Sequence, residues 1–282
     1  MSTEPLAPLA ELTDRDLSKI RRIVYEKSGI ALHAGKGALV TARLQRRLRA
    51  GGFRSFKEYV RYVQDDTSGD ELTALLDAIA TNHTAFFREP QHFEFLRDVV
   101  LPPLAARREH GVLTGWSAAC ATGEEPYTIA MTMLDQLGSG ASPRVRLVAS
   151  DLSTKALAVA RAGVYKAQRT NDVPRDVVRK YFERNPSLPP GSVRVSPRLR
   201  ACVEFKQLNL LDVTSSLPSF DFIFCRNVMI YFDREVQQRV VGTLEQHLAP
   251  GGYLFISHSE SLNRISHGLT WIAPAVYRRA SR

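Results

Sequence analysis

The chain has 282 residues, of which 44% are hydrophobic and 24% are charged, the balance of an ordinary globular protein of one or two domains. A chain of this length buries a full core without disulfides or structural metals, and its net charge of +9 favours an acidic partner, either nucleic acid or protein. No signal peptide precedes the first polar helix, and no apolar run is long enough to span a bilayer, so we expect a cytoplasmic protein.

Residues 1–80 are predicted to form a small helical domain. Thr13 is placed to cap a first helix, which Gly29 ends. A second helix follows within residues 38–52, and two shorter ones are predicted around 55–63 and 71–79. The second helix carries its apolar residues on one face at i, i+4 and i+8, namely Val40, Leu44 and Leu48.

The positive charge is concentrated in this domain. Between Lys36 and Arg61 there are eight basic residues and one acid, Glu58. On the second helix the arginines fall on the flanks and outer side, where they would repel one another. We interpret these arginines either as a solvated face or as a surface that binds an acidic substrate. They are Arg43, Arg46, Arg47 and Arg49.

After a linker at residues 81–92, apolar runs alternate with amphipathic helices up to a final strand near 271–277. This alternation predicts an α/β domain over residues 93–282, with a doubly wound, mostly parallel sheet. The alternation is interrupted at about 165–202, where turn residues surround a short apolar run. We interpret this segment as a small inserted β-subdomain.

Two acids follow the only glycine of the first strand-to-helix turn, in the stretch Gly123-Glu124-Glu125-Pro126. Carboxylates there would repel a phosphate but suit hydroxyls or a positive charge, although they also complement the positive end of a helix dipole. Asp151 ends the next strand, where an acid accepts both ribose hydroxyls or caps the following helix, a role for which Ser153 is better placed. A nucleoside without phosphate that carries a cationic amino acid is S-adenosylmethionine.

Metal chemistry is not indicated. The cysteines Cys120, Cys202 and Cys225 lie in apolar stretches without CxxC spacing, and the seven histidines are scattered. We therefore expect reduced thiols and no metal site.

Five stretches together resemble the chemotaxis receptor methyltransferases of the CheR family. They are TNHTAFFRE (81–89), WSAACATGEEPYTIA (116–130), ASDLS (149–153), FCRNVMIYFD (224–233) and ISHSE (256–260). The resemblance implies a Rossmann-like methyltransferase domain behind an all-α domain. It also implies methyl transfer from S-adenosylmethionine to glutamates of a chemoreceptor's cytoplasmic coiled coil, with S-adenosylhomocysteine as product.

The resemblance also implies site residues. Tyr231 matches a tyrosine near the methyl group, and Arg88 and Tyr231 are the implied catalytic residues. The implied cofactor contacts are Asn82, Thr84, Arg88, Glu125, Asp151, Asn209, Leu210, Arg226 and Asn227. Cys120, Ala121 and Ser257 depart from the family pattern without removing a contacting side chain.

The chemistry agrees with this assignment. A glutamate carboxylate is ionised at neutral pH and needs no general base, so the enzyme must align it and hold it with donors. Arg88, Arg226 and Tyr231 are suitable donors, although each also has a purely structural interpretation. For His258 a hydrogen-bonded structural role is favoured over acid–base catalysis.

Two alternatives remain at this stage. A nucleic-acid methyltransferase would explain the positive charge, but the run 227–230 lacks the proline that amine methylases place after strand four. A receptor-binding adaptor without turnover is the second. The sequence leaves open whether the β-subdomain binds a receptor C-terminal peptide, and a monomer is the default.

Overall fold

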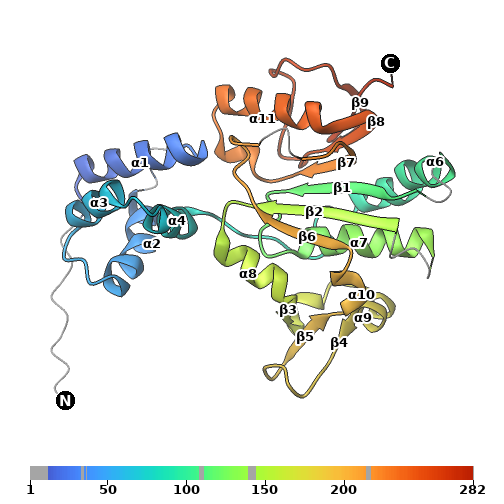
Figure 1. Ribbon diagram of the computed structural model, residues 1–282, viewed down its shortest axis with the longest axis horizontal. Helices are drawn as coiled ribbons and strands as arrows, with labels where there is room; N and C mark the ends of the chain where they lie inside the picture. The colour runs from blue at the N-terminus through green and yellow to red at the C-terminus, as the bar shows by residue number, and fades with distance from the viewer. Residues whose placement is uncertain are drawn as a thin grey trace. The chain divides into compact units, whose positions relative to one another are not determined.

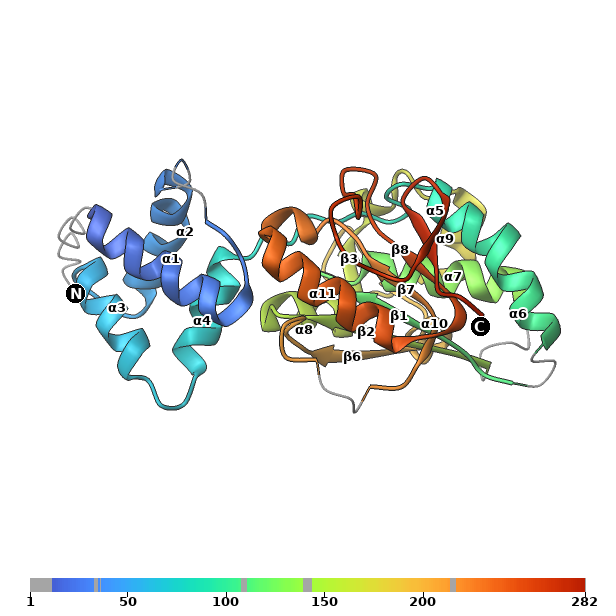
Figure 2. The same cartoon turned by 90° about the horizontal axis from the view of Figure 1, so that it is seen from above.

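The computed structural model describes residues 12–32, 35, 37–107, 111–138, 144–213 and 217–281. The chain divides after Thr81 into a helical unit and a larger α/β unit, each of which is described by itself (Figures 1 and 2). Lys36, part of the basic segment, lies outside the described residues.

The helical unit contains α1 (Asp14–Ser28), α2 (Gly37–Ala50), α3 (Phe56–Asp65) and α4 (Asp70–Ile79). Thr13 caps α1 by accepting a hydrogen bond from the Asp16 N–H, and Gly29 ends the helix with a φ of 72°. The expected apolar stripe of α2 is confirmed, because its three residues are at most 1% exposed and face the unit's core.

Two of the four α2 arginines have partners within the unit. Arg47 forms a two-pronged ion pair with Glu71, in which Nε lies 2.7 Å from Oε1. Arg43 donates to the carbonyls of Ile79 and Ala80 at the end of α4. The expectation that all four lie on a mutually repelling surface is therefore wrong for Arg43 and Arg47. Arg46 and Arg49 are exposed.

The α/β unit is built on a seven-stranded sheet with the order β6-β2-β1-β7-β8-β10-β9. The strands β6, β2, β1, β7 and β8 run parallel to one another, and β10 and β9 are antiparallel additions at one edge. Their bounds are β1 (Leu113–Ala118), β2 (Val145–Asp151), β6 (Val203–Gln207), β7 (Phe220–Cys225), β8 (Leu248–Phe255), β9 (Thr270–Ala273) and β10 (Val276–Arg278). The sheet confirms the predicted fold class.

The single final strand expected near 271–277 is in fact the hairpin β9–β10. Ala275 adopts a left-handed conformation, with a φ of 61°, in the turn that breaks it.

Several helices pack against this sheet. The helical segment before β1 comprises α5 (Gln91–Phe95), the π-helical turn η2 (Leu96–Val100) and α6 (Leu101–Arg107). Helix α7 (Glu124–Leu137) contacts β1 and β2, α8 (Thr154–Ala162) contacts β2 and β6, and α11 (Arg234–His247) contacts β8. Every residue of β7 is buried, as expected for a parallel strand covered on both faces.

A second, three-stranded antiparallel sheet with the order β3-β5-β4 lies between β2 and β6 in the chain (Figure 1). It comprises β3 (Val164–Lys166), β4 (Phe182–Glu183) and β5 (Ser192–Val195), with the 3₁₀ turn η4 (Ala167–Thr170) and the short helices α9 (Arg175–Tyr181) and α10 (Pro197–Arg200). The Tyr165 hydroxyl donates to the Thr122 carbonyl at 2.7 Å, which ties this insertion to the turn after β1. No helix among the described ranges is long and apolar enough to cross a membrane.

Gly123 marks a close approach of α7 and α8. Its φ is 95°, and an added Cβ would lie 2.8 Å from the Ala160 Cβ. We predict that Gly123→Ala lowers the free energy of unfolding by about 1–3 kcal/mol, because it adds both backbone strain and overlap. Gly242→Ala is the control: it lies within α11 with nothing near its Cβ, so alanine should stabilise by about 0.5–1 kcal/mol. Urea unfolding of both variants measures these changes in the free energy of unfolding. Equal changes in the two variants would contradict the close approach of α7 and α8 at Gly123.

Candidate active site

The site residues of the α/β unit gather where its parallel strands end. The turn at 119–125 follows β1, Asp151 ends β2, Arg226 follows β7, and the loop 256–260 follows β8. Because parallel strands present their carboxyl ends at one edge of a sheet, these segments meet there, beside the point where strand order reverses between β1 and β7.

The linker stretch 82–89 lies on the same edge. The Asn82 amide donates to the Ser153 hydroxyl at 3.3 Å, and the Phe87 N–H donates to the Thr128 hydroxyl at 3.2 Å. The Arg88 carbonyl accepts from Arg226 at 2.5 Å. The linker is therefore fixed against α7 and against the turns that follow β2 and β7.

Strained backbone is concentrated at this edge. Five non-glycine residues there have φ between 48° and 66°, a region that costs roughly 1–3 kcal/mol per residue: Phe87, Glu89, Ala119, Ala121 and Asn227. Strain of this kind persists only where surrounding contacts hold it. The linker and the turns after β1 and β7 are therefore tightly determined.

Arg226 is the centre of these contacts. Its side chain is 1% exposed and lies between two carboxylates, with Nη1 3.0 Å from Glu125 Oε2 and Nη2 3.2 Å from Glu89 Oε2. The guanidinium also lies over the rings of Phe93 and Phe224, 5.6 and 6.0 Å from their centroids. Its Nε has no hydrogen-bond partner among the described residues. Arg226 thus joins the linker, β7 and α7.

The two acids after Gly123 have different environments. Glu125 accepts from the Ser117 hydroxyl at 2.8 Å in addition to Arg226; burial raises its pKa, and the charge of Arg226 opposes that rise. Glu124 is held by the Thr122 hydroxyl at 2.6 Å and by Arg169 of η4 at 3.2 Å, and burial raises its pKa too. Of these two acids, Glu125 is the one that pairs with Arg226.

Asp151 connects two loops. Its Oδ2 accepts from the Ala121 N–H and its Oδ1 from the Ser153 N–H, both at 2.8 Å. Ser153 caps α8, with its hydroxyl 3.1 Å from the Ala156 nitrogen, so the cap falls where expected. Asp151 therefore joins the turn after β1 to the start of α8, at the end of β2.

The remaining candidates lie on neighbouring segments. Arg88 is half-buried and donates to the His83 carbonyl at 2.9 Å, and the Thr84 carbonyl accepts from Arg169 at the same distance. Tyr231 ends the 3₁₀ turn η5 (Met229–Tyr231) and is half-buried. After β6, Asn209 organises its own turn by accepting from the Leu211 N–H at 3.1 Å, and Leu210 is buried.

Glu89 belongs to the site but was not among the residues that the sequence analysis assigned to it. It accepts from the Ser257 hydroxyl at 2.8 Å, from the His258 N–H at 3.2 Å and from the Asn227 amide at 3.4 Å. Burial alone would raise its pKa, but the charge of Arg226 and the hydrogen bonds from Ser257, His258 and Arg226 lower the pKa to about 2. Glu89 is the last residue of the family-like stretch TNHTAFFRE, but the spacing of residues along the sequence did not indicate these partners.

Glu260 was also missed. It accepts from the backbone N–H groups of Asn227, Val228, Met229 and Ser257 at 2.8–3.2 Å. One carboxylate therefore holds the turn after β7 and the loop after β8 together. The sequence signal was only its position in ISHSE.

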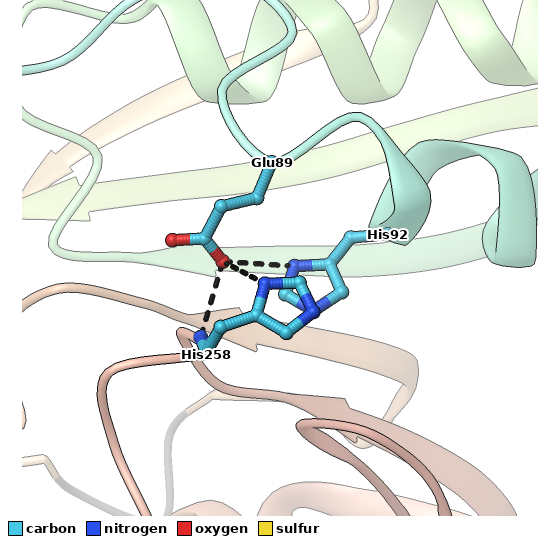
Figure 3. A group of neighbouring side chains, drawn as sticks. All are labelled: Glu89, His92 and His258. Atoms are coloured by element: carbon cyan, nitrogen blue, oxygen red, sulfur yellow. Dashed lines mark hydrogen bonds and ion pairs between the residues drawn. The ribbon is translucent and has the colours of Figure 1, made fainter.

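Figure 3 shows Glu89 with two stacked imidazoles, His92 and His258, whose centroids are 4.6 Å apart. The Nδ1 of His258 lies 3.1 Å from Glu89 Oε2, in line with the expected hydrogen-bonded role. His92 is buried, and its Nδ1 lies 3.5 Å from Glu89 Oε2, although neither of its ring nitrogens makes a hydrogen bond within the described ranges. Burial, together with the charge of Arg226, lowers the pKa of His92 to about 3, so its ring is neutral.

These three side chains have ligand atoms within 4.8 Å of one another. The rings are nearly parallel, at 12°, so their in-plane lone pairs do not converge on one point. The guanidinium of Arg226 also lies on the same Glu89 oxygen and would repel a cation. We therefore interpret the group as a structural cluster, in which His258 is hydrogen-bonded to Glu89 and His92 stacks on His258.

Comparison with known proteins identifies the family. Residues 15–80 match the all-alpha domain of CheR methyltransferase, and residues 82–274 match its SAM-binding domain.

The chain belongs to the CheR methyltransferase family. Among its relatives, the chemotaxis protein methyltransferase of Escherichia coli is 40% identical over 98% of this chain and 93% of its own length. That of Borreliella burgdorferi is 37% identical over 95% of each chain, and chemotaxis protein methyltransferase 2 of Pseudomonas aeruginosa is 40% identical over 95% and 94%. The cofactor of this CheR-family domain is S-adenosylmethionine.

The depressed pKa of Glu89 predicts a pH-dependent contribution to stability. The folded-state pKa of about 2 lies below the ordinary value near 4.3, so the stabilisation is complete above that value and is lost as pH falls toward 2. We expect Glu89→Gln to lower the free energy of unfolding by about 2–3 kcal/mol at pH 7. The difference in free energy of unfolding between wild type and variant should become smaller below about pH 4.5. Denaturant unfolding at several pH values measures this difference. A difference in free energy of unfolding that does not change with pH would contradict the ion pair between Glu89 and Arg226.

Proposed function

We propose that this protein transfers the methyl group of S-adenosylmethionine to glutamate side chains of a chemoreceptor's cytoplasmic coiled coil. The relatives' name, chemotaxis protein methyltransferase, supports the pathway. The turn after β7 supports a carboxylate rather than an amine as the methyl acceptor. The backbone N–H groups of 227–229 are bound to Glu260, and the run 227–230 contains no proline. It therefore lacks the Asn/Asp-Pro-Pro-aromatic run with which amine methylases hold an amine.

The described residues fit the cofactor. Asp151 lies at the end of β2, where such folds place the acid that accepts ribose hydroxyls, and Glu125 places a carboxylate after β1 for a cationic group. We assign to the same site Asn82, Thr84, Arg88, Asn209, Leu210, Arg226 and Asn227. When bound, the cofactor supplies a methyl group on a positively charged sulfur.

The acceptor needs alignment rather than activation. An ionised carboxylate oxygen attacks the methyl carbon, a C–O bond forms as the C–S bond breaks, and the sulfur takes the bonding pair. Arg88 and Tyr231 are the proposed donors that hold the carboxylate, because Arg226 is already bound to two internal carboxylates. No proton is transferred in this step.

The product distinguishes this function from its alternatives. We predict that incubation with radiolabelled cofactor and a receptor cytoplasmic fragment gives a methyl ester, which releases methanol at high pH. A base-stable product would indicate N-methylation, and binding of both partners without transfer would indicate an adaptor. A fragment with its methyl-accepting glutamates replaced by alanine is the control.

The exposed arginines of α2 are the proposed receptor surface. Arg46 and Arg49 are solvent-exposed, whereas Arg43 and Arg47 are held within the helical unit. A receptor helix that bears glutamates would complement the exposed pair. Arg43 and Arg47 then contribute mainly by fixing α2 against α4.

The double variant Arg46→Ala/Arg49→Ala should raise KM for the receptor fragment about two- to thirtyfold, since exposed ion pairs contribute about 0.2–1 kcal/mol each. Affinity for S-adenosylmethionine should not change, and wild-type KM should rise with salt. Arg239→Ala, an exposed arginine on α11, is the matched control. If the double variant keeps the KM of wild type at both low and moderate salt, the exposed arginines of α2 form only a solvated face.

A further inference from the structure

The turn that carries Tyr231 has few hydrogen bonds of its own. The segment η5 spans only Met229–Tyr231, and a 3₁₀ turn of this length has poorer hydrogen-bond geometry than an α-helix. The Tyr231 N–H donates to the Val228 carbonyl at 3.1 Å, and the Phe232 N–H donates to the Met229 carbonyl at 3.0 Å. The position of Tyr231 therefore depends on groups outside the turn.

One side chain of α11 bridges both ends of this turn. The Nε2 of Gln237 donates to the Met229 carbonyl at 2.9 Å and to the Phe232 carbonyl at 3.2 Å. These two carbonyls come before and after Tyr231 in the chain. Gln237 itself lies near the start of a helix that is capped by the Asp233 side chain, so the bridge extends from a fixed base.

Packing alone does not fix the turn. A pocket of about 270 Å³ lies against it, and its lining includes Met229, Ile230, Gln237 and Glu260. Atoms that face a void lose the contacts that would hold them in place. Two polar side chains compensate: Glu260 accepts from the backbone N–H groups at the start of the turn, and Gln237 donates to the carbonyls.

We propose that Gln237 is a positioning residue for methyl transfer, which holds η5 so that the Tyr231 hydroxyl meets the acceptor carboxylate. The inference rests on the proposed function, in which Arg88 and Tyr231 hold that carboxylate. In-line transfer depends on close alignment, and a displacement of about 1 Å can lower the rate about a hundredfold. The carbonyls that Gln237 binds belong to residues outside the assigned cofactor contacts. Its loss should therefore affect turnover rather than cofactor binding.

The test removes the two hydrogen bonds and keeps the bulk of the side chain. For Gln237→Met we expect kcat with the receptor fragment to fall about tenfold, while the Kd of S-adenosylmethionine, measured by calorimetry, changes by less than about twofold. Gln238→Met is the matched control, because Gln238 is the next residue of α11, is also half-buried and donates to a carbonyl outside η5, that of Ser266. It should keep kcat within about twofold of wild type.

A double variant separates positioning of Tyr231 from a general loosening of the fold. If Gln237 acts through the Tyr231 hydroxyl, Gln237→Met should lower kcat by a much smaller factor in a Tyr231→Phe background than in wild type. Equal factors in the two backgrounds would overturn the proposal. An unchanged kcat in Gln237→Met, or an equal decrease in Gln238→Met, would overturn it as well.

If Gln237→Met does not fold, Gln237→Glu tests the same contacts, because a carboxylate of the same length repels both carbonyls. It should lower kcat about tenfold or more without changing the Kd of S-adenosylmethionine, and a wild-type kcat would overturn the proposal. Absence of methyl transfer by wild type would contradict the proposed function and this inference with it, whereas the other adverse outcomes overturn the inference alone.

Discussion

The buried ion cluster of Arg226 with Glu89 and Glu125 is the interaction on which the rest of the site depends. Removing charges from water is costly, and only good geometry with additional hydrogen bonds offsets that cost. Here the hydroxyls of Ser117 and Ser257 supply some of those bonds. Because the three charged residues come from the linker, the turn after β7 and the start of α7, the cluster forms only when all three segments are in place.

The same requirement explains the strained backbone. Glu89 and Asn227 have left-handed φ values, and both are bonded to neighbours that would lose contacts if the backbone relaxed. Glu260 reinforces this by accepting four backbone N–H groups from two segments. The strain is thus held by polar contacts made largely between loops, and the regular elements beneath act as the frame.

Local signals in the sequence predicted much of the fold and part of the site. The caps at Thr13 and Gly29, the stripe of α2 and the apolar strand β7 follow from periodicity and turn chemistry, which act over a few residues. The edge position of Asp151 follows from the rule for parallel sheets. The partners of Arg226 could not be predicted in this way, because Glu89 lies more than a hundred residues away and no spacing encodes that contact. For the same reason the internal pairs of Arg43 and Arg47 were missed: Glu71 and the end of α4 come close only after the helices pack.

The attachment of the inserted sheet has a consequence for how the protein can diverge. Arg169 of η4 bonds both to the Thr84 carbonyl in the linker and to Glu124 at the start of α7, and Tyr165 of β3 bonds to the Thr122 carbonyl. These bonds attach the insertion to the linker and to the start of α7, two of the segments that hold the Arg226 cluster. The strand β4 lies at the far edge of the small sheet from β3. We therefore expect substitutions in β4 and the turns beside it to disturb the candidate site less than substitutions in β3 and η4.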